Sequence, residues 1–198
     1  MFRNKLIVQR TIVLMSDIKT AYNLLDKFIK NENLKKHCYS VESVMRFYAG
    51  QLGENSDKWA SAGLLHDLDW EMFPDTHPNT AAPILLESGF DEELVEAVLG
   101  HAYPDRTDVP RISLLSKYLF ACDEITGFVM AYSLMKSGGL NEVEPKSIKK
   151  KMKDKAFAKN VNREDIQKGA DEIGIELEVH IQNVINAMKN DSRVNPPN

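Results

Sequence analysis

The chain has 198 residues, a formal net charge of −4 and 43% apolar residues, which suits one domain with a substantial core. The weak negative charge argues against nucleic acid and against an anionic membrane surface as partners. No segment approaches the roughly 20 apolar residues of a membrane span, and two cysteines, Cys38 and Cys122, are too few for a disulfide framework. We therefore expect a cytoplasmic protein.

Apolar residues recur at three- and four-residue steps from residue 16 onward, which is the period of an α-helix. The predicted helices cover, in chain order, residues 18–30, 34–52, 57–66, 77–89, 92–101, 111–136, 161–174 and 175–189. The predicted N-caps are Ser16 or Asp17, Asn55 or Ser56, Asp91 and Asn162, and Pro110 is predicted at the first position of its helix. The pattern predicts an all-α fold.

The two ends of the chain are expected to differ from the middle. Residues 1–15 have a strand-like composition and precede the first helical pattern, so we treat them as an N-terminal extension that need not belong to the fold. No repeat or linker divides residues 16–190, which we predict to be a single domain. Residues 191–198 are predicted to form a flexible tail.

Several polar residues occupy positions where apolar ones are expected. His37 shares a helix face with Leu34 and Val41, and Asp123 lies one turn beyond Leu119 in the most apolar helix. Burying a lone carboxylate costs several kcal/mol unless its charge is compensated. The compensating partner could be a buried Lys or Arg. It could also be a divalent ion shared by the residues His37, His66, Asp67 and Asp123. Imidazole and carboxylate ligands together suit manganese, iron, cobalt, nickel, zinc or magnesium.

Four motifs occur in the order KKHCYSVE, GLLHDLDWE, GHAYP and ACDEITG, between residue 34 and about residue 130. This order resembles the HD superfamily of metal-dependent phosphohydrolases, and the segment SIKKKMKDKAFAKNVNREDI is similar to an uncharacterised branch of predicted hydrolases within it. The resemblance implies a single helical-bundle HD domain with the metal between its helices. It also implies that the metal ligands are His37, His66, Asp67 and Asp123.

The number of ions stays open at this point. His101 corresponds to a histidine that binds a second ion in two-metal members, and His77 could join it. Such members usually carry a further histidine before the last aspartate, yet none lies between His101 and Asp123. His101 could instead donate to a phosphate oxygen, and His77 could be a loop or helix-cap residue.

The general acid cannot be transferred from the family. Some one-metal members have a glutamate three positions after the aspartate of the motif, where this chain has Trp70. The neighbouring Asp69 and Glu71 are candidates by proximity, and surface carboxylates are the alternative. In the lysine-rich segment, Lys149 and Lys153 could attract phosphate at the rim of the site or could lie on a solvated helix face.

The resemblance implies a hydrolase that acts on a nucleotide or another small phosphate ester through a metal-activated water. The expected partner is thus a small phosphorylated molecule, with no membrane and no nucleic acid. One alternative is a non-catalytic metal- or nucleotide-binding regulatory protein with an HD fold. Another is a helical interaction module in which the polar residues pair with one another.

Overall fold

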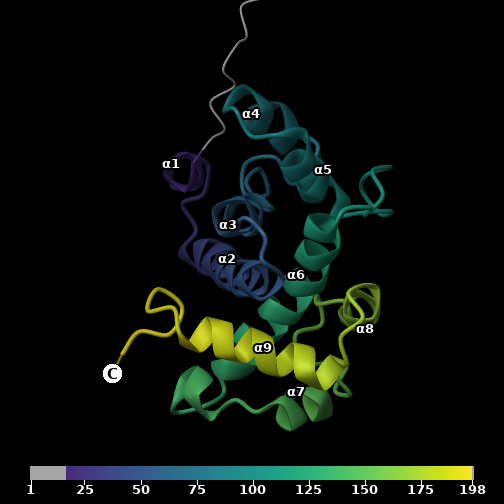
Figure 1. The fold of residues 1–198 in the computed structure, drawn as a ribbon. Helices are drawn as coiled ribbons and strands as arrows, with labels where there is room; N and C mark the ends of the chain where they lie inside the picture. Colours follow the sequence, from purple (N-terminus) through teal and green to yellow (C-terminus); the bar gives the residue numbers. More distant parts are fainter. Residues whose placement is uncertain (1–16, 198) are drawn as a thin grey trace, which may run out of the picture.

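A computed structural model describes residues 17–197, and their regular structure is helical (Figure 1). The predicted extension, residues 1–15, lies outside the described residues, as does the candidate cap Ser16. The elements are α1 (Ile18–Phe28), α2 (Glu32–Leu52), α3 (Ser56–Leu65), α4 (Ala81–Glu87), α5 (Glu92–Gly100), α6 (Leu114–Ser133), the 3₁₀ helix η1 (Gly139–Glu142), α7 (Pro145–Lys151), α8 (Arg163–Glu172) and α9 (Leu177–Lys189). The all-α prediction is confirmed.

The long helix α6 organises the bundle. It runs from α5 at one end of the molecule to α9 and η1 at the other, and α2 and α8 also pack along it (Figure 1). Helix α3 lies against α2, and α9 crosses below them with α7 on its outer side. The buried apolar side chains form one continuous core. Among the described residues, no helix is long and apolar enough to cross a membrane.

Side-chain caps set most of the helix starts. The predicted caps Asp17, Asn55, Asp91 and Asn162 each accept a hydrogen bond from a backbone N–H in the first turn of their helix. Helix α6 begins later than predicted, because Ser113 caps it by accepting from the Ser116 N–H, and Pro110 lies outside the helix.

Two further segments differ from the prediction. The helix expected over residues 77–89 is shortened to α4, because residues 74–80 form turns that pack His77 into the interior. The segment predicted as a tail, residues 191–198, is described as far as residue 197 and contacts the rest of the domain. Val194 is buried in the core, and Arg193 Nη1 lies 2.9 Å from Oε2 of the buried Glu42 in α2. An ion pair and a buried apolar side chain therefore connect this segment to the core.

Glycine permits a close approach of α3 to α2. A Cβ atom at Gly63 would lie 2.9 Å from the backbone nitrogen of Glu42, nearer than real Cβ contacts allow. The small residue lets the two helices approach closely, which brings the end of α3 beside His37 of α2.

A second close approach joins α8 to α6 and supports a stability prediction. A Cβ at Gly169 would lie 2.6 Å from Ala121 Cα, so Gly169→Ala should lower the free energy of unfolding by about 1–3 kcal/mol through overpacking. The matched control is Gly50→Ala, also in a helix, where a Cβ meets no atom within 4 Å. That variant should be neutral or more stable by about 0.4–1 kcal/mol. Urea denaturation of both variants measures the difference, and equal stabilities would contradict the packing.

Candidate metal centre

Four side chains meet where α2, α3 and α6 come together. His37 lies on α2, His66 and Asp67 end α3, and Asp123 lies on α6. His37 Nε2 is 2.9 Å from Asp123 Oδ1 and 3.1 Å from His66 Nε2. Asp67 Oδ2 is 3.5 Å from His66 Nε2 and 3.9 Å from His37 Nε2. Two ligand atoms that each lie roughly 2.0–2.2 Å from an ion, with an angle of about 90° at the ion, are about 3 Å apart. The distances between these four side chains are close to that value, so the four donors fit around a single ion.

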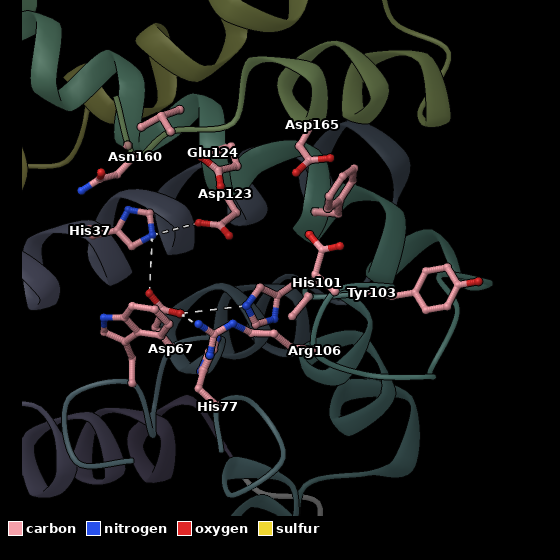
Figure 2. Close-up of a pocket in the computed structure, with 16 residues that line it drawn as sticks. His37, Asp67, His77, His101, Tyr103, Arg106, Asp123, Glu124, Asn160 and Asp165 are labelled. Atoms are coloured by element: carbon pink, nitrogen blue, oxygen red, sulfur yellow. Dashed lines mark hydrogen bonds and ion pairs between the residues drawn. The ribbon is translucent and has the colours of Figure 1, made fainter. Parts of the chain in front are cut away.

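A second group of donors adjoins the first and shares Asp67. Its other oxygen, Oδ1, lies 3.5 Å from His77 Nε2 and 3.9 Å from His101 Nε2. The donor atoms of Asp67, His77 and His101 all lie within 4.8 Å of one another. Asp67 therefore lies between two clusters of potential ligands, with one carboxylate oxygen toward each (Figure 2).

Three of the four histidines around Asp67 are oriented by a hydrogen bond at Nδ1, on the side of the ring away from the donor groups. His66 Nδ1 bonds to the Gly63 carbonyl at 2.8 Å, and His101 Nδ1 bonds to the Val98 carbonyl. His77 Nδ1 lies 2.7 Å from Asp69 Oδ1. With Nδ1 engaged in this way, each Nε2 faces the cluster, which is the arrangement that metal-binding histidines adopt in proteins.

The charges of the centre match its donor chemistry. Burial opposes ionisation of Asp123, but the neighbouring His66 and His37 hold the pKa of this carboxyl well below its usual range. Burial also opposes protonation of His66, yet Asp67 and Asp123 raise the pKa of this imidazole to about 9. For His101, burial and then the nearby His66 lower the pKa to about 4. The Asp123 carboxylate thus stays ionised and attracts positive charge.

Asp69 and Glu71 do not have the catalytic positions considered from the sequence. Asp69 is fully buried behind His77, and its Oδ2 accepts the Ala81 N–H at 2.8 Å. Glu71 Oε2 accepts the backbone N–H groups of Lys30 and Asn31, at 2.8 and 2.9 Å. Asp69 therefore orients His77, and Glu71 ties the loop after α3 to the start of α2.

A cavity of about 460 Å³ opens above the two donor groups. It is lined by His37, Asp67, Trp70, His77, His101, Ala102, Tyr103, Asp105, Arg106, Phe120, Asp123, Glu124, Gly127, Asn160, Val161 and Asp165.

Four polar residues of this lining were not predicted from the sequence: Arg106, Glu124, Asn160 and Asp165. Glu124 adjoins Asp123 in the ACDEITG motif, which was a usable signal; burial and then the charge of Asp123 raise its pKa to about 7. Asn160 and Asp165 carry no comparable signal, because they arrive through the packing of α8 on α6.

Lys149 and Lys153 do not line this cavity. They lie beside Leu177 and Glu178 in a separate groove between α7 and α9. Lys149 Nζ is 3.1 Å from Glu178 Oε2, so this cation pairs with its own surface. The proposed phosphate-attracting rim is wrong for these two residues, because the lysine-rich helix packs on α9 and away from the donor groups.

The other polar or reactive residues near the core have structural roles. Burial raises the pKa values of the Cys38 and Cys122 thiols, so both remain neutral buried side chains. His180 is fully buried, with Nδ1 at 2.6 Å from Tyr48 Oη and Nε2 at 2.8 Å from the Ala121 carbonyl. It is a satisfied core histidine.

Comparison with known proteins identifies the central part of the chain. Residues 34–127 match the family model of the HD domain. This segment contains every donor of the two groups. No curated protein and no solved structure matches the chain.

Proposed function

Because its HD domain places the chain in the HD superfamily of metal-dependent phosphohydrolases, we propose that it hydrolyses a small phosphate ester, such as a nucleotide, with two divalent ions. His37, His66, Asp67 and Asp123 would hold the first ion. Asp67, His77 and His101 would hold the second. Asp67 would bridge the pair.

The position of Asp67 carries this proposal. Its two carboxylate oxygens face different donor groups, and both groups open into the same cavity. A helical module whose polar residues merely pair with one another would not need the ring nitrogens of His37 and His66 to face each other at 3.1 Å. Two facing imidazole nitrogens and the nearby carboxylate oxygens instead form a donor set suited to a transition metal.

Two ions held in this site would bind phosphoryl oxygens and would lower the pKa of a water molecule. In the proposed hydrolysis, a water oxygen bonds to phosphorus, the ester P–O bond breaks, and a proton passes to the departing alcohol. The chain positions these groups. Asp69 holds His77 in place, and the carbonyls of Gly63 and Val98 orient His66 and His101.

The regulatory alternative shares the ligands and differs in turnover. We expect chelator-treated protein to release phosphate from p-nitrophenyl phosphate only after divalent ions such as manganese are restored. His66→Ala should lose this activity because one ligand is gone. Ion binding without hydrolysis of monoesters, diesters or nucleotides would favour the regulatory site and would contradict the enzyme proposal.

A further inference from the structure

The cavity above the donor groups has two chemically different sides. Figure 2 shows Asp67, His77 and Arg106 together on one side, and Glu124, Asn160 and Asp165 on the other. The first side is formed by the turns that follow α3 and α5, and the second by α6, the turn that precedes α8 and the first residues of α8. A bound ester spanning the cavity would meet both sides.

Arg106 supplies positive charge on the side of the donor groups. Its guanidinium lies over the Trp70 ring, 5.0 Å from the ring centroid, and Nη1 donates to the Pro74 carbonyl at 2.8 Å. The other guanidinium N–H groups have no hydrogen-bond acceptor within the described residues. An arginine held in this way keeps donors free for two oxygens of one phosphate. In the part of the chain that the structure describes, no other Lys or Arg lines this cavity.

The opposite side offers mainly hydrogen-bond acceptors. Glu124 Oε2 accepts the Asn162 N–H at 3.1 Å, and Asp165 Oδ2 accepts from Asn162 Nδ2 at 2.6 Å. The second oxygen of each carboxylate has no hydrogen-bond donor among residues 17–197. The side-chain amide of Asn160 also has no hydrogen-bond partner among these residues. A carboxyl oxygen that lacks a donor can accept a hydrogen bond, so the matching ligand atoms are hydroxyl or amino groups.

The same carboxylates disfavour additional negative charge. Asp105, Glu124 and Asp165 line the cavity in addition to the two carboxylates of the metal centre, against the single guanidinium of Arg106. Like charges at close range repel, and the repulsion grows where water is partly excluded. Sites for single-stranded nucleic acid instead have positively charged grooves. A polyphosphate or an oligonucleotide would place its extra phosphates against this acidic side.

We propose that the cavity selects a compact phosphate monoester whose alcohol half carries hydroxyl or amino donors, as a sugar phosphate or a nucleoside monophosphate does. This inference rests on the proposed function. Arg106 donates hydrogen bonds to the phosphate beside the ions. Glu124, Asn160 and Asp165 accept hydrogen bonds from the alcohol half. The volume of about 460 Å³ lies in the range of small-molecule sites and suits a ligand of this size.

Binding of non-hydrolysable phosphonates to manganese-loaded protein tests the selectivity. The two probes are the phosphonate analogues of ribose 5-phosphate and of pentyl phosphate, which share the phosphoryl group and differ in hydroxyl groups. Calorimetry should show about tenfold tighter binding of the ribose analogue, because charge-assisted hydrogen bonds are lost with the pentyl analogue. Asp165→Asn and Asn160→Ala should each reduce this preference. Asn160 is exposed, so its variant provides a test that does not disturb the core.

Arg106→Gln should weaken both phosphonates and inorganic phosphate by a similar factor, because all three share the group that Arg106 binds. The control is the double substitution Lys149→Gln and Lys153→Gln, which changes two cations outside this cavity and should leave every affinity unchanged. Equal binding of the two probes by the wild-type protein, or tighter binding of a nucleoside triphosphate than of the monophosphate, would overturn the inference. Because phosphonate binding needs no turnover, absence of hydrolysis would contradict the proposed function separately.

Discussion

Replacing Asp67 with alanine is expected to remove both divalent ions and to abolish phosphate release. The two oxygens of Asp67 face separate donor groups, so this one substitution deletes a ligand from each. A metal ion contributes several kcal/mol to stabilising the charge of a phosphoryl transition state, which corresponds to a loss of about a thousandfold or more in kcat/KM. Elemental analysis and the phosphatase assay measure the two effects.

Asp67→Asn and Asp75→Ala are the matched controls for this substitution. Asparagine keeps one carbonyl oxygen, so Asp67→Asn should retain at most one ion. Asp75 lies exposed in the loop after α3, and Asp75→Ala should keep wild-type metal content. If Asp67→Ala still binds two ions per chain with wild-type affinity, Asp67 is not the bridge.

Arg111→Ala should cause the largest loss of stability among the substitutions considered. The Arg111 side chain is only 3% exposed, and its Nε and Nη2 each donate to a different Glu172 carboxylate oxygen at 2.9 Å. Its Nη1 donates to the Gly100 and Tyr103 carbonyls, and its guanidinium stacks 3.7 Å from the Phe120 ring centroid. Removing one partner of a buried ion pair costs about 3–5 kcal/mol. Because the Glu172 side chain is 24% exposed, we expect a loss near the lower end of this range in the free energy of unfolding, measured by urea denaturation.

The stability loss caused by Arg111→Ala should depend on pH. Hydrogen bonds from Arg111 lower the pKa of Glu172. A carboxyl with a depressed folded-state pKa contributes stability above its unfolded pKa of about 4.3, and the contribution is lost as the pH falls through the folded value. The difference between wild type and Arg111→Ala should therefore shrink in acid. Lys168→Ala, which removes an exposed cation 5.7 Å from the same Phe120 ring, should have little effect at any pH. A difference that grows in acid would contradict this account of Arg111.

Local patterns were sufficient for much of the fold. Helical periodicity and the capping side chains of Asp17, Asn55, Asp91 and Asn162 act within one or two turns, so the sequence reveals them directly. The C-terminal segment could not be predicted in the same way. Its polar, proline-rich composition is typical of a loose tail. In the structure, however, Arg193 forms an ion pair with the buried Glu42, which lies far away in the sequence.

The site was predictable where its residues end or interrupt apolar helices. His37, His66, Asp67 and Asp123 stood out as polar groups in apolar surroundings, and the structure brings all four together. The role of Asp69 depends on how the turns after α3 fold back, which no short-range pattern encodes. The lysines failed as candidates because net charge along the sequence does not say which side of the bundle a helix faces.

The most direct test of a two-ion centre bridged by Asp67 is anomalous X-ray diffraction from crystals loaded with manganese. The account predicts two anomalous peaks about 3.5–4 Å apart on either side of the Asp67 carboxylate, the spacing of two-metal hydrolytic sites. One peak should lie among His37, His66 and Asp123, and the other between His77 and His101. A single peak, or no peak within the cavity, would contradict the two-ion centre.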